Sequence, residues 1–203
     1  MTINQLLPSC QLLSSKKLLL GLLLAAAPLA QADWKLDTSA SSLAFVTTKA
    51  TSIAEVNHFD RLDGSIDAQG NATLTIDLTS VNTGVPVRDE RMQNILFETE
   101  KFPKATLTAK VPLDQLAKLK VGVQQNVDLD ARLNIRGVDL TVNTTVSALK
   151  LQNGELLVSS IKPIVVNASA VDLADGVEAL RQVAGLPNIS LSVIVTFQLA
   201  YKS

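Results

Sequence analysis

The sequence predicts an all-β domain of antiparallel strands with two short helices between them. Apolar and polar residues alternate with a period of two over most of the chain after residue 34, which is typical of strands with one buried face. Tight-turn residues separate the alternating segments and favour an antiparallel meander. With so few helices, the apolar faces must cover one another, either in a closed barrel or in a stacked sandwich.

The predicted strands are recognised by apolar residues at every second position. Turn signals lie at 68–71, at Arg136-Gly137 and at Asn153-Gly154, and the last is the strongest hairpin signal in the chain. Closure would abolish exposed edges, and a barrel of about eight strands has an interior that side chains fill or that holds one small ligand. The alternating segments run over 43–45, 62–66, 72–78, 105–111, 127–135, 138–146 and 189–201.

Two segments depart from this alternation and predict helices over 87–97 and 175–184. In the first, Met92, Ile95 and Leu96 fall on one helical face. The second has an apolar stripe at the same helical spacing and a glycine just past its end. Both helices are therefore expected to lie between strands with one face toward the core.

The N-terminus predicts a secretory signal peptide over 1–32. Two lysines precede an apolar run over 18–27, and a small-residue A-x-A pattern ends at Ala32. The run is short for a membrane span of about 20 residues, so cleavage after Ala32 is favoured over an uncleaved anchor. Because Cys10 lies upstream of the run, a lipid-modified cysteine is not expected. The exported domain is then residues 33–203, with a periplasmic address.

Composition argues against several classes of function. The 18 basic and 19 acidic residues and the 3% aromatic content disfavour a nucleic-acid binder, which needs basic grooves and stacking surfaces. One histidine and one cysteine disfavour a metal centre or a Cys/His catalytic pair. Without Cys10 the exported domain has no disulfide. His58 is expected to be structural, and no Gly-x-Ser-x-Gly elbow accompanies it.

Several segments together resemble the YceI-like family of exported lipid-binding proteins. Among them are DWKLDTSASSLAFV, the strand and loop LTIDLTSVNTG, the long stretch VRDERMQNILFETEKFPKATL and the hexapeptide LNIRGV. Their order and spacing cover nearly the whole chain after the predicted leader. The matching segments are 33–46, 57–59, 62–64, 74–84, 87–107 and 133–138.

This resemblance implies an extended antiparallel lipocalin-like β-barrel around a long apolar tunnel. The tunnel is expected to hold an isoprenoid, either a polyprenyl diphosphate or an isoprenoid quinone, with no catalytic residue, no metal and no cofactor besides the lipid. Transient contact with a membrane or membrane protein is expected of a monomer or homodimer. A link to stress is implied for some relatives.

One segment departs from the family pattern. The family often has His-Phe-Gly before the last strand, whereas this chain has VEALRQVAGL over 177–186. We expect a helix there, with Asp175 as N-cap, Glu178 three residues on and Gly185 past its end. The departure concerns the closing end of the tunnel and not the barrel.

The predicted tunnel lining combines inward strand residues with residues of the first helix. An isoprenoid has no hydrogen-bonding tail groups, so its wall should be aliphatic; the alternative for each residue is ordinary packed core, which the sequence does not distinguish from a cavity wall. Met92 has a flexible thioether that suits an adaptable wall. The predicted residues are Leu43, Phe45, Leu74, Ile76, Leu78, Leu107, Leu133, Ile135, Val142, Val195 and Phe197 from strands, and Met92, Ile95 and Phe97 from the first helix.

Arg88 and Arg91 are the predicted contacts for a polar head group. A guanidinium pairs with phosphate oxygens in a fixed geometry, so these two residues could meet a diphosphate or carbonyl at the tunnel mouth. The alternative is a solvated helix face with local ion pairs to Asp89 and Glu90. Asp89 has a second possible role, which is to hold the 82–84 loop by accepting from backbone amides.

The leading functional hypothesis is a non-enzymatic periplasmic carrier for an isoprenoid lipid. A rival is a stress-related interaction protein whose barrel is filled and which binds no small molecule. A third is a hydrolase or isomerase that uses His58 and a nearby aspartate on the bound lipid. A hollow interior separates the first hypothesis from the second.

Overall fold

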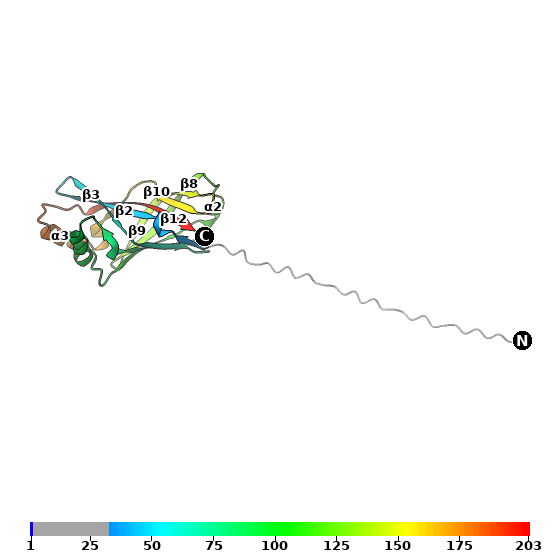
Figure 1. The fold of residues 1–203 in the computed structure, drawn as a ribbon, viewed down its shortest axis with the longest axis horizontal. Coiled ribbons are helices and arrows are strands. Elements are labelled where there is room, and N and C mark those ends of the chain that lie inside the picture. The colour runs from blue at the N-terminus through cyan, green and yellow to red at the C-terminus, as the bar shows by residue number, and fades with distance from the viewer. Residues whose placement is uncertain (2–32) are drawn as a thin grey trace. The chain divides into compact units, whose positions relative to one another are not determined.

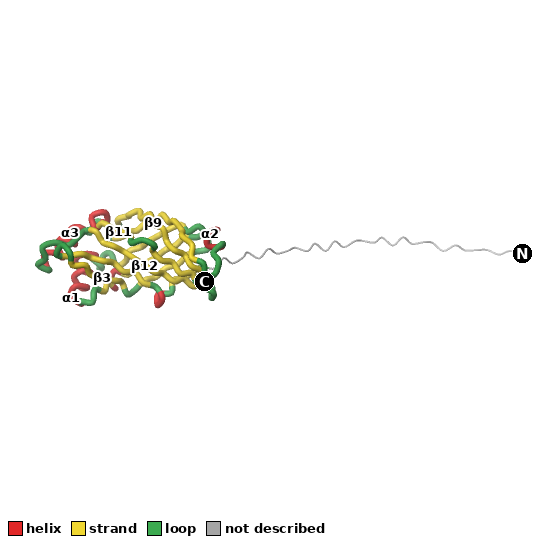
Figure 2. The backbone as a smooth tube through the Cα atoms, turned by 90° about the horizontal axis from the view of Figure 1, so that it is seen from above, coloured by secondary structure: helices red, strands yellow, loops and turns green. Residues whose placement is uncertain are grey.

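The alternating segments form an antiparallel sheet that wraps around itself (Figures 1 and 2). The computed structural model describes Met1 and residues 33–203, and the predicted leader lies outside the described residues. The strands of this described part are β1 (Trp34–Leu36), β2 (Ser42–Lys49), β3 (Ile53–Phe59), β4 (Leu62–Ile66), β5 (Asn71–Asp77), β6 (Val81–Asn82), β7 (Lys104–Lys110), β8 (Gln124–Ile135), β9 (Val138–Lys150), β10 (Leu156–Ser160), β11 (Ile164–Asn167) and β12 (Ser192–Lys202).

Eight of these strands close into a barrel in the order β1-β4-β5-β7-β8-β9-β10-β12. The ring closes because β1 pairs with β4 on one side and with β12 on the other. Every pairing between these strands is antiparallel. The predicted all-β class is confirmed, and of the two predicted arrangements the chain adopts the barrel, which leaves no free edge in this ring.

β12 extends the barrel wall beyond the closed ring. Its C-terminal part, 198–202, pairs with β10 and β1. Its earlier part pairs with β11 on one side and with β2 on the other, and β2 continues through β3 to β6. Helices α1 and α3 lie at this extended end of the barrel, whereas α2 lies at the opposite end (Figures 1 and 2).

The hairpin turns follow backbone conformations that the sequence only partly reveals. Arg136 and Gly137 both have positive φ, 52° and 79°, as a two-residue type I′ turn requires. The turn between β2 and β3 was not predicted, because it has the same φ signs at Ala50 and Thr51 without Gly or Asn. The Thr51 amide donates to Asn188 Oδ1 at 2.9 Å, so a distant side chain supports this turn.

The first predicted helix forms as two segments of different geometry. α1 covers Pro86–Arg91, and η3 (Met92–Phe97) continues it as a π-helix. Short 3-10 helices are η1 (Thr38–Ala40), η2 (Leu78–Ser80) and η4 (Ala168–Val171).

The second predicted helix is α3 (Ala174–Val183). The predicted N-cap was wrong: Leu173 occupies that position without a side-chain hydrogen bond, and Asp175 lies in the first turn, where the helix dipole still favours its charge. α2 (Leu113–Ala117) was not predicted. It is only five residues long and has no side-chain cap, so its sequence carries little helical signal.

Gly176 lets α3 lie directly on η3. A Cβ at this position would lie 3.0 Å from Leu96 Cα and 3.1 Å from its Cδ1. We therefore expect Gly176→Ala to push the two helices apart and to lower the free energy of unfolding by about 1–3 kcal/mol, the usual cost of overpacking. Urea unfolding followed by circular dichroism measures the effect. If Gly176→Ala is as stable as the wild type, the two helices separate without a cost in free energy, which would contradict this expectation.

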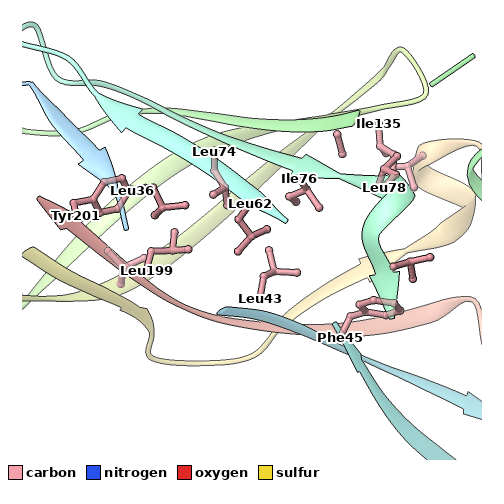
Figure 3. Close-up of a cluster of buried hydrophobic side chains, with 14 of the residues drawn as sticks. Leu36, Leu43, Phe45, Leu62, Leu74, Ile76, Leu78, Ile135, Leu199 and Tyr201 are labelled. Carbon is pink, nitrogen blue, oxygen red and sulfur yellow. The ribbon is translucent and has the colours of Figure 1, made fainter. Parts of the chain in front are cut away.

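The core occupies the barrel interior, where inward side chains from opposite strands meet. Figure 3 shows Leu43, Leu62, Leu74 and Leu199 pointing into this interior from four strands, and each is buried. Burial raises the pKa of Tyr201 to about 12, so its hydroxyl stays neutral at physiological pH. The buried side chains of the closed part of the barrel are mostly apolar.

Candidate functional site

The extended end of the barrel contains a cavity of about 350 Å³, here called the main cavity. This volume is within the range of about 300–1,000 Å³ that is common for ligand pockets. The interior is therefore hollow. The rival hypothesis requires a barrel filled by its own side chains, and the cavity argues against it. The cavity wall includes inward residues of β2, β5, β7, β8, β9, β11 and β12.

Every predicted site residue except Ile95 lines the main cavity. The strand register explains why the period-two pattern located them: residues opposite each other in an antiparallel pair project to the same face of the sheet. The residues that the structure brings together at the cavity wall are Leu43, Phe45, Leu74, Ile76, Leu78, Arg88, Arg91, Met92, Phe97, Leu107, Leu133, Ile135, Val142, Val195 and Phe197.

Two sets of paired residues show this register directly. Phe45 lies opposite Val195, in the β2–β12 pair. Leu107 lies opposite Leu74 on one side and Leu133 on the other. In each set, apolar side chains lie next to one another across neighbouring strands of the cavity wall.

Ile95 does not line the main cavity, and the π-helix explains why. Prediction of a shared face for Met92, Ile95 and Leu96 assumed α-helical spacing. A π-helix bonds residue i to i+5, so its turns are wider and residues four and five apart share a face. Met92, Leu96 and Phe97 accordingly line the cavity. Ile95 does not, and its carbonyl oxygen lies toward Gly176 of α3.

Sequence reasoning missed the contribution of α3 and the segments next to it. Val177, Leu180 and Ala184 of the predicted apolar stripe line the cavity, as does Leu186 beyond the helix. The stripe was visible in the sequence, but what it covers was not. The departure from the family pattern at 177–186 thus supplies part of the cavity wall.

β11 was missed although its sequence carries a signal. Ile164 and Val166 line the cavity and alternate with Val165, whose exposed fraction is 65%. The segment is only four residues long, which is short for a pattern of period two to stand out. Leu129 and Ala131 of β8 also line the cavity and belong to an alternating segment that was predicted.

Charged side chains gather at one part of the cavity wall, where the β2–β3 hairpin faces α1. We call Lys49, Glu55, Arg88 and Arg91 the charged rim; all four line the main cavity. Glu55 Oε2 accepts from Arg88 Nη1 at 2.7 Å and lies 2.9 Å from Lys49 Nζ. Arg88 therefore bridges to β3, and the alternative of ion pairs within its own helix is wrong.

The 82–84 loop holds Arg88 in place. Thr83 accepts from Arg88 through its hydroxyl oxygen, at 2.8 Å from Nε, and through its carbonyl oxygen, at 2.7 Å from Nη2. Asp89 accepts from the Thr83 amide at 2.8 Å and from its hydroxyl at 2.6 Å. The predicted role of Asp89 in holding this loop is confirmed. Arg91 lies one helical turn beyond Arg88, so both side chains are on one face of α1.

The ionisation of Glu55 follows from this geometry. The hydrogen bond from Arg88, helped by Lys49, holds the pKa of Glu55 below its ordinary value of 4.5. A lowered pKa means that the charged form stabilises the fold above about pH 4.5 and that this contribution is lost as the pH falls through the lower folded-state value. Glu55 is therefore negatively charged at neutral pH, beside the basic side chains of the charged rim.

A carboxyl titration by NMR tests this arrangement. We expect Arg88→Ala to raise the pKa of Glu55 toward 4.5, because Arg88 is the cationic partner that lowers this pKa most. Lys101→Ala serves as the matched control, because Lys101 pairs with Glu98 elsewhere on the surface. An unchanged Glu55 titration in Arg88→Ala would contradict the bridge.

His58 does not face the cavity. Its side chain is 51% exposed, and its Nε2 lies 3.0 Å from Asp60 Oδ1. Because it alternates with the cavity residue Phe59, it belongs to the outer face of β3. His58 is therefore not placed to act on a lipid enclosed in the main cavity.

Within 33–203, no cluster of three or more His, Cys, Asp and Glu side chains is placed to hold a metal ion. None of the helices described by the structure is long and apolar enough to cross a membrane.

These features define an extended antiparallel β-barrel with an internal apolar cavity and a charged rim. Comparison with known proteins identifies the family to which this barrel belongs. Residues 34–200 match the YceI-like domain, and the chain therefore belongs to the YceI-like family. No curated protein matches the chain.

Two solved structures illustrate the relationship. A polyisoprenoid binding domain from Saccharophagus degradans, implicated in plant cell wall breakdown, is 40% identical with a TM-score of 0.82, covering 84% of this chain and 98% of the domain. BcnA from Burkholderia cenocepacia is 18% identical with a TM-score of 0.63, covering 81% of this chain and 98% of BcnA. The second likeness shows the shared fold alone.

Proposed function

We propose that this chain is an exported, non-enzymatic binding protein that holds an isoprenoid lipid in the main cavity. The observation that carries the proposal is the cavity itself, whose wall is almost entirely aliphatic and aromatic away from the charged rim. The 40% identical domain from Saccharophagus degradans, a polyisoprenoid binding domain, supports the same ligand class.

The energetics of burial favour a prenyl tail. Each buried CH2 contributes about 0.8 kcal/mol, so a five-carbon unit contributes up to roughly 4 kcal/mol before ordering costs. A few units are therefore enough for tight binding. A tail without hydrogen-bonding groups leaves no polar atom unsatisfied in such a wall.

The head group belongs at the charged rim. Three cations and one anion give this part of the wall a surplus of positive charge, which suits a polyprenyl diphosphate. An isoprenoid quinone would accept hydrogen bonds from the same guanidinium groups through its carbonyl oxygens. Arg91 is the residue proposed to contact the head most directly, since Arg88 already donates to Glu55 and Thr83.

The proposed address is the periplasm. The support is the signal-peptide pattern over 1–32, which lies outside the described residues. A carrier in an aqueous compartment has to shield its lipid from water, as an enclosed cavity would. Transfer to or from a membrane would then be its working cycle.

Lipid extraction tests the proposal. The full chain is expressed with its leader, and the exported protein is purified without detergent and extracted with organic solvent. We expect mass spectrometry to find a prenyl lipid at near-equimolar ratio, and N-terminal sequencing to begin at Asp33. Absence of any prenyl lipid, together with no thermal shift when stripped protein is given ubiquinone or polyprenyl phosphate, would refute the proposal.

A further inference from the structure

A second, smaller cavity lies deeper in the closed part of the barrel. Its volume is about 80 Å³, and we call it the far chamber. Its wall includes Leu156 and Tyr201, which are among the most buried residues of the described chain, and Leu116 of α2. Because α2 lies at the end of the barrel opposite α1 and α3 (Figure 2), the far chamber extends toward the end opposite the charged rim.

Six residues, here called the shared residues, line both cavities and mark where the far chamber meets the main cavity. The shared residues come from five of the eight strands of the closed barrel, β5, β7, β8, β9 and β12. Phe197 is the aromatic residue among them and has the largest side chain. The residues that line both cavities are Leu74, Leu107, Ala109, Leu129, Val146 and Phe197.

Phe197 projects into the bore between the two cavities. It lies opposite Leu43 of β2, and its neighbours Thr196 and Gln198 are exposed on the outer face. Although it points inward, Phe197 is only partly buried, since empty space adjoins it on both sides. A phenyl side chain with free space on two sides can change rotamer at less steric cost than a phenyl side chain in a close-packed core.

We propose that the far chamber is a binding subsite for the distal isoprene units of a long prenyl chain, and that Phe197 sets the chain length the barrel accepts. This inference rests on the proposed function and deepens it. A short chain fills the main cavity alone. A longer chain reaches the far chamber only when the Phe197 ring turns aside, and its end then meets Leu156 and Tyr201.

Affinities for a series of prenyl phosphates test this inference. The probes are farnesyl, geranylgeranyl and octaprenyl phosphate, which share one head group and differ in chain length. We expect Phe197→Ala to raise the ratio of octaprenyl to farnesyl affinity by about tenfold, because it joins the two cavities. Phe197→Trp should lower the same ratio by about tenfold.

Two further variants control for position and folding. Val193 lies on the same strand and face as Phe197 but lines the main cavity only, so Val193→Ala should change all three affinities alike. Val158 lines the far chamber only, and Val158→Phe should lower the octaprenyl to farnesyl ratio even if Phe197→Ala proves unstable. Thermal melting confirms that each variant tested is folded.

The outcomes separate this inference from the proposed function. If wild-type protein binds the probes but the Phe197 and Val158 variants leave the affinity ratio unchanged, the far chamber is ordinary core and the inference is wrong. If no probe binds to wild type or to any variant, the proposed function fails together with the subsite. A shifted ratio in Val193→Ala equal to that in Phe197→Ala would also overturn the assigned role of Phe197.

Discussion

Val195→Trp is expected to reduce the affinity for prenyl lipids by about a hundredfold or more, because the indole fills the space that the tail would occupy. Val195 lines the main cavity between Phe45 of β2 and Ile164 of β11, which line it too. Isothermal titration with geranylgeranyl phosphate measures the change. A dissociation constant equal to that of wild type would mean that the lipid binds elsewhere.

The neighbouring residue supplies a matched control. Ile194 is next in the chain, but its side chain points outward and is 40% exposed, and it does not line the cavity. Ile194→Trp therefore adds the same indole to the same strand on the other face, and we expect the affinity to remain that of wild type. A similar loss in both variants would show that β12 had been distorted and not that the cavity had been filled.

Leu62→Ala is expected to have the largest effect on stability, lowering the free energy of unfolding by about 2–5 kcal/mol. Leu62 is 7% exposed and lines neither cavity, so its removal leaves a new hole in packed core. Leu133 lines the main cavity and is less completely buried. Because it already lacks neighbours on the cavity side, Leu133→Ala should fall at or below the lower end of the same range.

Guanidinium unfolding of lipid-free protein compares the two variants. Adding a saturating prenyl lipid should widen the stability gap between wild type and Leu133→Ala, since the lipid supplies the contacts that Leu133 lacks in the empty barrel. It should leave the cost of Leu62→Ala nearly unchanged. Equal costs in the empty protein would indicate that Leu133 is packed as tightly as Leu62, and hence that the main cavity is closed in solution.

Much of the fold was predictable because strand alternation is a local property. The inward positions of β5, β7, β8 and β9 could be read from period two alone, since each strand largely coincides with one alternating run of the sequence. Closure was different. It depends on Lys35 pairing with Lys202 and with Ser65, contacts between residues far apart in the sequence that no local pattern encodes.

The hollow interior was not predictable for a related reason. The same Leu, Val and Phe residues line a packed core or a cavity, and which one forms depends on the volume that the closed wall encloses. The error at Ile95 has a local cause, because the switch from α1 to a π-helix at Met92 changes which residues share a face. The bridge from Arg88 to Glu55 spans 33 residues, and its partner could not be identified from helix spacing.

A crystal structure of the exported protein, purified without removal of its lipid, would show whether the main cavity holds a prenyl chain. We expect continuous density for a prenyl chain in the main cavity, with the head group within hydrogen-bond distance of Arg91 and the tail directed toward Phe197. A barrel with its own side chains closed over the main cavity, or a lipid bound only on the outer surface, would contradict this expectation.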